Sequence, residues 1–221
     1  MQWYGNTRAQ LAEEYEPYEQ DSVFLALANE HDDVLGTMRF LVGAHKGLKT
    51  IDDMERAPWC VDSGRSAAAA GLDLHRVWDV ATMGLRPGIR DSRTQLSFAL
   101  YHGFVTTMRM NRVHAIVAII DERVRRLMSA AGLATLSMPG TEAGPYLGSG
   151  ASTPVYAHVA GTLDRQRREF PDAYRLITLG VGLDGVSVPT SSHFRLESWL
   201  LTQASPPRDR QLESTVTGRL R

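Results

Sequence analysis

The chain has 221 residues, 43% of them hydrophobic, which is enough for one globular domain with an ordinary core. Its 24 basic and 25 acidic residues give a formal net charge of -1, which removes the bulk electrostatic argument for a nucleic-acid-binding protein. A single cysteine, Cys60, excludes an intrachain disulfide and a cysteine-built zinc site. No signal-like segment opens the sequence and no apolar run approaches the roughly 20 residues of a membrane span, so we expect a cytoplasmic protein.

The first third of the chain predicts a helix followed by a hairpin. Apolar residues recur at helical spacing within residues 6–20, which predicts a short helix on the surface. Two apolar runs, residues 21–30 and 34–43, flank three polar residues and predict antiparallel strands joined by a hairpin loop. The apolar pattern is lost in residues 44–75, where glycines and an alanine run predict a flexible excursion that could cover a cleft.

The middle of the chain predicts a strand, a helix, a second strand and a second helix. Residues 77–85 predict a strand that ends at a turn rich in proline and glycine. Residues 94–110 carry apolar side chains at helical spacing, and the apolar run at residues 113–120 predicts a buried strand. Asp121 is placed to cap a further helix, which Gly132 ends.

The last third of the chain is less regular. Residues 154–160 predict a final strand, and residues 163–179 predict a helix that a proline interrupts. The segment after Pro206 is polar enough to fray. We therefore predict one domain over residues 1–160, and a C-terminal helical extension with a flexible tail over residues 161–221.

Basic side chains gather where the central strand meets the next helix. The carboxyl end of the strand leads to the N-terminus of the helix, where backbone N–H groups and the helix dipole favour an anion. Arg86, Arg90 and Arg93 surround this turn, and arginine suits a pyrophosphate or the phosphate of phosphopantetheine. The same arginines can equally form a solvated surface. The turn is a candidate site for a phosphate-bearing ligand.

Three motifs and the order of the elements carry a resemblance to a known family. The motifs are Glu16, Tyr18, Glu19 and Asp21 in YEPYEQD, Gly36 and Arg39 in VLGTMRFL, and Trp78 and Asp79 in VWDVATMGL. With the predicted order of helices and strands, they resemble the GNAT-type acyl-CoA N-acyltransferases. Within that superfamily the chain is most similar to the acyl-homoserine-lactone (autoinducer) synthases and the long-chain N-acyl amino acid synthases. The likeness spans about residues 13–159.

The sequence departs from the pattern of those synthases at several positions. Asp79 stands where they usually carry Glu and Thr82 where they carry Arg, so homoserine lactone is not assumed as the product. The glycine-rich turn retains only Gly88, as in the lactone synthases. Met128 lies where many acetyltransferases place a tyrosine acid.

The resemblance implies an α/β (α+β), GNAT-like fold with a mixed, mostly antiparallel central sheet flanked by helices. It implies an acyltransferase that moves an acyl group from acyl-CoA, or from the acyl-phosphopantetheine of an acyl carrier protein, to the amine of a small amino-acid-like acceptor. We expect no metal, because the seven histidines show no spacing typical of a metal site.

Asp79 is the candidate general base. Transfer of an acyl group to an amine requires removal of a proton from the attacking ammonium, and a carboxylate on an apolar strand tends toward a raised pKa. The alternative is that Asp79 caps a helix or pairs with an arginine such as Arg76. The resemblance adds Glu19 and Thr82 to the catalytic candidates.

Four residues are candidates for contact with the acceptor: Glu16, Asp21, Arg39 and Trp78. The resemblance implies that Arg39 pairs with a nearby acidic residue and with the carboxylate of the acceptor, for which a bidentate guanidinium is suited. The alternative for Arg39 is a solvent-facing side chain, and for Glu16 and Asp21 a solvated acidic loop. The alternative for Trp78 is packing in the core or cleft.

The remaining assignments concern the donor. Candidate cofactor-binding residues are Met83, Leu85, Arg86, Gly88, Arg90 and Arg93. Candidate residues of an apolar slot for the acyl chain are Ile116, Ala118, Met128, Leu136 and Val155. A basic rim that could meet an acidic carrier protein comprises Arg109, Arg112, Arg123, Arg125 and Arg126, which could also merely solubilise helix ends.

Two other functions stay open. One is a short-chain acetyltransferase acting on another amine. The other is a non-catalytic acyl- or CoA-binding sensor or interaction domain, which the residues at positions Thr82 and Met128 favour.

Overall fold

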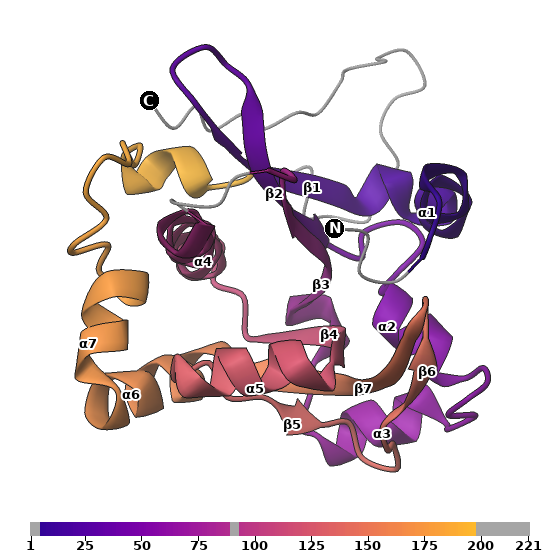
Figure 1. Cartoon of the computed structure of the whole chain (residues 1–221). Helices are drawn as coiled ribbons and strands as arrows, with labels where there is room; N and C mark the ends of the chain where they lie inside the picture. Colours follow the sequence, from indigo (N-terminus) through magenta and orange to yellow (C-terminus); the bar gives the residue numbers. More distant parts are fainter. Residues whose placement is uncertain (1–4, 89–92, 198–221) are drawn as a thin grey trace.

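A computed structural model describes residues 5–88 and 93–197 of the chain. They form a mixed seven-stranded sheet in the order β1-β2-β3-β4-β7-β5, with β6 paired to β7 (Figure 1). The strands are β1 (Ser22–Ala28), β2 (Val34–Leu41), β3 (Val77–Leu85), β4 (Ala115–Asp121), β5 (Leu136–Ser137), β6 (Gly144–Tyr146) and β7 (Ser149–His158). Among these strands β3 and β4 pair in parallel, and the other pairs are antiparallel. The predicted mixed, mostly antiparallel sheet with flanking helices is confirmed.

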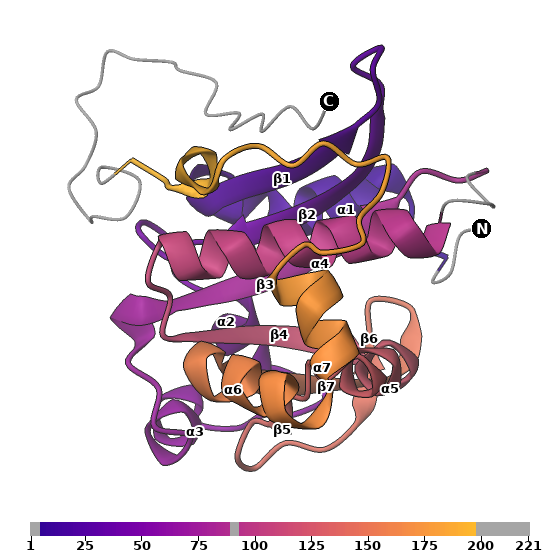
Figure 2. The same cartoon turned by 90° about the vertical axis from the view of Figure 1, so that its left-hand side faces the viewer.

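Helices cover both faces of this sheet. The longer ones are α1 (Arg8–Tyr15), α4 (Arg93–Met110), α5 (Glu122–Ala130) and α6 (Val159–Glu169). The shorter ones are α2 (Lys49–Met54), α3 (Ser63–Ala69) and α7 (Pro171–Ala173). Short 3-10 or π-helical segments lie at η1 (Glu16–Asp21), η2 (Leu74–Arg76), η3 (Tyr174–Thr178) and η4 (Ser191–Phe194). Figure 2 shows α4 lying along the sheet, with α5, α6 and α7 below it on the same side.

The sheet separates two hydrophobic cores. The larger core joins β1, β2 and β3 to α4 and contains Phe40, Trp78, Leu100 and Phe104 among its buried residues. The smaller core lies on the opposite face, under α2 and α3. Because neighbouring residues of a strand point to opposite faces, Trp78 enters the larger core while Val77 enters the smaller one.

The central elements have the bounds that their periodicity predicts. The strand at residues 77–85 and the hairpin strands β1 and β2 are confirmed. The helix predicted at residues 94–110 is α4. Asp121 caps α5 by accepting a hydrogen bond from the backbone N–H of Arg123, and Gly132 follows the helix with a φ of 73°. The interruption of the last helix falls at Pro171, between α6 and α7.

The prediction of a flexible excursion over residues 44–75 is wrong. The segment forms α2 and α3, and Leu48, Met54 and Ala67 are buried against the second face of the sheet. Both helices are short, at 6 and 7 residues, so their apolar positions do not build a visible period. The segment is therefore part of the core rather than a mobile cover.

The expected surface helix near the N-terminus is partly wrong. It ends at Tyr15 and continues as the turn η1, which contains Pro17. Tyr15 and Tyr18 are buried, with 5% and 3% of their surface exposed, whereas Leu11 on the predicted apolar stripe is 37% exposed. The two tyrosines thereby bring this segment into the interior.

The C-terminal segment packs on the larger core. Ile177, Phe194 and Leu196 are buried there. The side chain of Asn111, which directly follows α4, donates a hydrogen bond to the carbonyl oxygen of Phe194 and accepts one from the backbone N–H of Leu196. The division of the chain at residue 160 stays a prediction. The segment after Pro206, which was predicted to fray, lies outside the described residues.

Candidate active site

The candidate site begins where β3 and β4 separate. These parallel strands pair at three positions, the last being Asp79 with Val117. Beyond that point β3 stays with β2 as far as Leu85, while β4 stays with β7 as far as Asp121. A wedge therefore opens between the carboxyl ends of two neighbouring parallel strands, which is where open α/β sheets commonly bind ligands.

A cleft of about 370 Å³ occupies this wedge. Its walls include Tyr15 of α1, Val80 to Met83 of β3, Tyr101 and Phe104 of α4, Ile116 to Asp121 of β4 apart from Val117, Val124 and Met128 of α5, and Tyr146 and Leu147 near the β6–β7 turn. Most of these side chains are apolar. A cleft of this size and composition suits an elongated, largely apolar ligand.

A β-bulge shapes the β3 wall of the cleft. Val80 lies opposite Phe40 and Thr82 opposite Arg39, so Ala81 is an extra residue in β3. The hydroxyl of Tyr15 donates a hydrogen bond to the carbonyl oxygen of Ala81 at 3.0 Å. This bond connects α1 to the strand at the point where the wedge opens.

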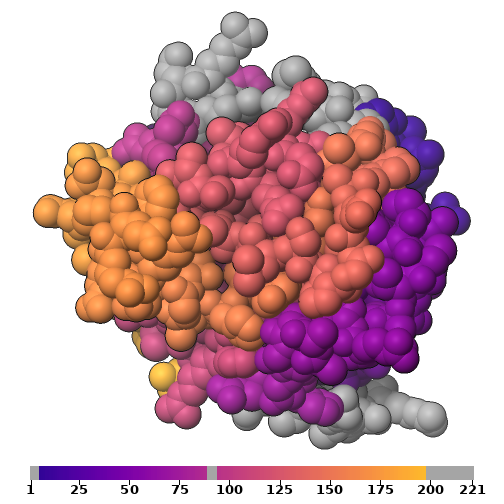
Figure 3. Space-filling view, turned by 90° about the horizontal axis from the view of Figure 1, so that it is seen from below, coloured from indigo at the N-terminus to yellow at the C-terminus, as the bar shows by residue number. Residues whose placement is uncertain are grey.

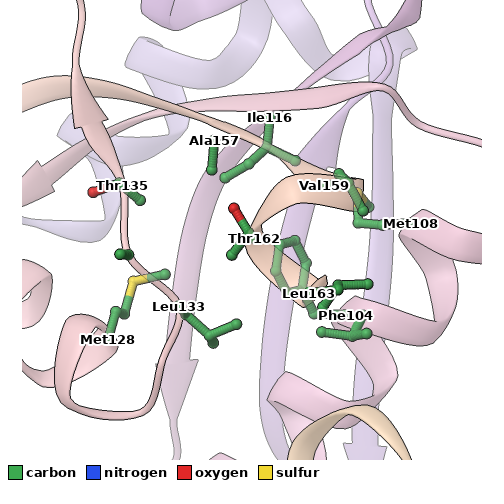
Figure 4. A pocket seen from close by; sticks show the side chains of 12 residues that line it. Phe104, Met108, Ile116, Met128, Leu133, Thr135, Ala157, Val159, Thr162 and Leu163 are labelled. Carbon is green, nitrogen blue, oxygen red and sulfur yellow. The ribbon is translucent and has the colours of Figure 1, made fainter. Parts of the chain in front are cut away.

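A second, smaller chamber of about 30 Å³ adjoins the cleft. Phe104, Ile116 and Met128 line both spaces. Figure 4 shows Met128 and Leu133 on one side of this inner chamber, facing Phe104, Met108 and Leu163 on the other. The two spaces together form an apolar pocket that extends from the wedge toward α6.

Asp79 lies beside the cleft, on the face of the sheet that α2 covers. It is 1% exposed and accepts hydrogen bonds from the backbone N–H of Thr50 at 2.5 Å and from its hydroxyl at 3.0 Å. Burial raises the pKa of Asp79 to about 7, although the bonds from Thr50 oppose the rise. Asp79 thus holds the first turn of α2, a structural role of the kind that the sequence left open as the alternative to catalysis.

A small space of about 10 Å³ separates Asp79 from the cleft. Tyr15, Val80, Ala81, Ile119 and Tyr146 line both this space and the cleft. A volume of this size is on the scale of one water molecule. We call it the Asp79 chamber.

Arg39, a predicted acceptor residue, binds Glu19, a predicted catalytic residue. Arg39 is 9% exposed; it forms an ion pair with Glu19 and donates from Nε to the Ser22 hydroxyl at 2.8 Å. Its guanidinium also stacks over the ring of Tyr15, 4.8 Å from the centroid. The expected pairing of Arg39 with an acidic residue is therefore present. The paired guanidinium also packs on the ring of Tyr15.

Other predicted site residues lie away from the cleft. Asp21 is fully buried and accepts hydrogen bonds from the backbone of His45 and Lys46 at 2.7 and 2.6 Å, so it fixes that loop. Glu16 is exposed. Trp78 packs against Phe40 in the larger core.

The residues predicted to bind the donor are also divided. Met83 lines the cleft, as does the catalytic candidate Thr82, whereas Leu85 packs against the larger core. The backbone N–H of Arg86 donates a hydrogen bond to the carbonyl oxygen of Leu35. Gly88 has a φ of 95°. Arg90 and the side chain of Arg93 lie outside the described residues.

Of the five predicted acyl-slot residues, Ile116, Ala118 and Met128 line the cleft. Leu136 is 59% exposed on β5, and Val155 is buried but lines neither space. Seen from below (Figure 3), the region of β5 and α5 lies between the C-terminal helices and the α2–α3 segment.

Sequence reasoning missed several residues that the structure brings together. Thr50 and Lys49 lie in the segment predicted to be flexible, and Tyr146 lies in a short strand that was not predicted. The available signal was local: Gly148 follows two residues after Tyr146, and glycine favours turns.

Neither a membrane segment nor a metal centre emerges from the described part of the chain. None of its helices is long and apolar enough to cross a membrane. Within the same residues, no group of three or more His, Cys, Asp or Glu side chains could hold a metal ion.

Comparisons with known proteins find similarity in solved structures. No protein-family model matches the chain, and no curated protein matches it. A CoA-dependent acyl-homoserine lactone synthase, BjaI, with SAM and isopentyl-CoA is 18% identical, with 68% of this chain and 66% of that chain covered and a TM-score of 0.47. The same synthase with MTA gives 17% identity, the same coverage and a TM-score of 0.42.

A spermidine N-acetyltransferase, SpeG, from Vibrio cholerae in complex with CoA and spermine is also similar. It is 10% identical, with 72% of this chain and 79% of that chain covered and a TM-score of 0.39. The chain thus spans just under two thirds of the synthase, at 66% of its length. Because identity and superposition are both low, the function must rest on the geometry of this chain.

Proposed function

We propose that the protein is an N-acyltransferase, which moves an acyl group from acyl-CoA or an acylated carrier protein to the amine of a small amino-acid-like acceptor. The observation that carries this proposal is the buried carboxyl of Asp79 beside an apolar cleft, which opens between diverging parallel strands. The Asp79 chamber shares five wall residues with that cleft. The sequence motifs described above favour the same chemistry.

The cleft suits the donor. An acyl chain would lie along Ile116 and Met128 and reach the inner chamber, whose lining side chains are almost all apolar. Beyond Asp79, the edge of β3 that faces β4 takes no part in the described sheet ladder. Its backbone N–H groups are candidates to stabilise the oxyanion that forms on the thioester carbonyl. We infer that medium or long acyl chains are preferred.

Asp79 suits the proton transfer. As a carboxylate it would take a proton from the acceptor ammonium, directly or through a water molecule in the Asp79 chamber. The free amine then attacks the thioester carbonyl, the C–N bond forms and the C–S bond breaks. The second amine proton goes to the leaving thiolate, so one proton is released to solvent for each amide formed. A pKa of about 7 leaves a large carboxylate fraction at neutral pH.

A carrier-protein donor has a candidate docking surface on α5. Arg123 and Arg126 are exposed there, and Leu127, which directly follows Arg126, is 70% exposed. Arg125 is engaged with Glu122 at 3.3 Å. A basic surface with an exposed apolar residue would complement an acidic helix of a carrier protein. Exchanging Arg123 and Arg126 for Glu should slow turnover of the acylated carrier and leave turnover of acyl-CoA unchanged.

One observation favours a second candidate function. The backbone N–H and the hydroxyl of Thr50 both donate hydrogen bonds to Asp79, so this carboxyl has a structural role that does not depend on catalysis. A protein that binds an acyl thioester without turning it over would keep the cleft and the same bonds. The short-chain acetyltransferase has no such support, because the inner chamber would serve no purpose for an acetyl group.

The deciding experiment measures thiol release and product mass. The wild type is incubated with acyl-CoA from acetyl to palmitoyl, and with the acylated carrier protein, each against a mixed pool of amino acids and amines. We expect release that requires an acceptor, favours longer chains and is lost in Asp79→Asn. Tight binding of acyl-CoA without release from any thioester would favour the non-catalytic candidate.

A further inference from the structure

Lys49 is a buried cation with no role in the scheme above. Its side chain is 4% exposed and forms ion pairs with Asp53 at 2.5 Å and with Glu14. Three phenol rings surround its ammonium group, with centroids 5.5, 5.9 and 5.6 Å away: Tyr15, Tyr18 and Tyr146. Burying a charge is costly even when it is paired, so its place in the interior needs a reason.

The surroundings of Lys49 connect it to Asp79. Lys49 directly precedes Thr50, which holds the carboxyl, and it lines the Asp79 chamber. The titratable groups around Asp79 are Tyr15 from α1, Lys49 and Asp53 from α2, and Tyr146 from β6. Two further charges lie behind them: Glu14 of α1 pairs with Lys49, and Arg56 is 3.6 Å from Asp53. Lys49 is the buried cation of this set. Its field favours the ionised form of Asp79, whereas the field of Asp53 opposes it.

The same cluster sets the wall of the cleft. The hydroxyl of Tyr146 donates to Asp53 at 2.5 Å, and the hydroxyl of Tyr15 donates to Ala81. Burial raises the pKa of both phenols, so they act as hydrogen-bond donors throughout the working range of pH. Both rings pack near Lys49 and line the cleft as well as the Asp79 chamber.

We propose that Lys49 is a positioning residue for the acyl transfer: its ammonium is the fixed positive charge that supports the Asp79 carboxylate and orders Tyr15 and Tyr146 at the boundary of the cleft. This inference rests on the proposed function, because it gives Lys49 a task only if Asp79 must ionise during turnover. It accounts for the position of Lys49, a buried cation that lies beside Asp79 and is itself paired with Glu14 and Asp53.

The test compares two substitutions with opposite signs. Lys49→Met removes the positive charge, so the acid limb of the kcat/KM profile should move to higher pH. Asp53→Asn removes a negative charge, so the same limb should move to lower pH. A movement of about half a pH unit corresponds to about a threefold change in kcat/KM on the acid side. Lys49→Arg, which keeps the charge, should leave the limb in place.

Lys46→Met is the matched control. Lys46 lies three residues earlier, pairs with Asp52 at 2.8 Å and is half exposed, and it does not line the Asp79 chamber. Its loss should not move the limb. Equal losses of activity at every pH in Lys49→Met and Asp53→Asn, with the limb unmoved, would overturn the proposal.

A readout that needs no turnover separates this inference from the proposed function. Carboxyl carbon NMR of Asp79, assigned with Asp79→Asn, follows its ionisation directly in the same variants. If the wild type turns over no thioester, the proposed function fails. Opposite shifts of the Asp79 titration would still establish the charge support by Lys49, and an unmoved titration would refute it. Thermal unfolding confirms that each variant is folded.

Discussion

Asp79 has a carboxyl that is buried within the sheet and held by both donors of Thr50. Its pKa of about 7 lies above the ordinary value of 3.8, so the folded protein binds a proton more tightly than the unfolded chain does. Stability from this group is therefore present below pH 4 and lost as pH rises to about 7. At 1.36 kcal/mol per unit, the loss is at most about 4 kcal/mol.

Asp79→Asn should therefore separate activity from stability. The amide carries no charge to bury and can still accept the bond from the backbone of Thr50. At pH 8 its melting temperature should exceed that of the wild type by about 5 °C or more, and the gain should shrink toward zero at pH 4. Thermal unfolding across this range measures the effect. A variant less stable than the wild type at pH 8 would show that Asp79 serves mainly to cap α2.

Single residues were predictable where their own strand or motif defined them. Asp79 and Arg39 were singled out because each stands on an apolar strand within a short motif. Their partners were harder to find. Thr50 is 29 residues from Asp79, and Tyr146 is 93 residues from Asp53, so only the fold brings these pairs together.

At the scale of elements, the packing of α4 on β1 depends on Gly103. A Cβ added at this position would lie 2.8 Å from a methyl group of Leu25, which is closer than real contacts allow. The missing side chain therefore lets the helix approach the strand. Gly161 in α6 offers a contrast, because nothing lies within 4 Å of its added Cβ.

Gly103→Ala should destabilise the protein by about 1–3 kcal/mol through overpacking. Gly161→Ala should instead stabilise it by up to about 1 kcal/mol, because alanine is the better helix former and no contact opposes it. Urea unfolding of both variants measures the difference. Equal effects of the two substitutions would contradict the close approach of α4 to β1.

Elements were predictable in proportion to their length and periodicity. The hairpin, β3, α4, β4 and α5 have clear apolar patterns, and their bounds were nearly correct. The short elements α2, α3, β5 and β6 were missed because stretches of 2 to 7 residues show no period. Those elements carry Lys49, Thr50 and Tyr146, so the candidate site was less predictable than the fold.

At the scale of the whole molecule, the cleft and the inner chamber arise from the divergence of β3 and β4 under α4, α5 and α6. Ala157 of β7 lines the inner chamber and does not line the cleft. It is therefore a position from which the inner chamber can be filled without blocking the site of the chemistry.

Ala157→Leu should shorten the preferred acyl chain. Each methylene that can no longer be buried loses about 0.8 kcal/mol, or about fourfold in kcat/KM. Activity with short chains should be unchanged, and the exposed Leu136→Ala should leave the whole profile unchanged. The measurement is kcat/KM over a series of acyl-CoA substrates. An unaltered chain-length profile in Ala157→Leu would show that the acyl chain lies elsewhere.

The central claim is that this cleft transfers an acyl group from a thioester to an amine with Asp79 as the base. Its most direct test is thiol release from acyl-CoA or acylated carrier protein, compared with and without the amine pool in the wild type and in folded Asp79→Asn. We predict release that depends on the acceptor, yields an N-acyl product by mass and falls by about 100-fold or more in the variant. Equal release by the two proteins, or none from any thioester, would contradict the claim.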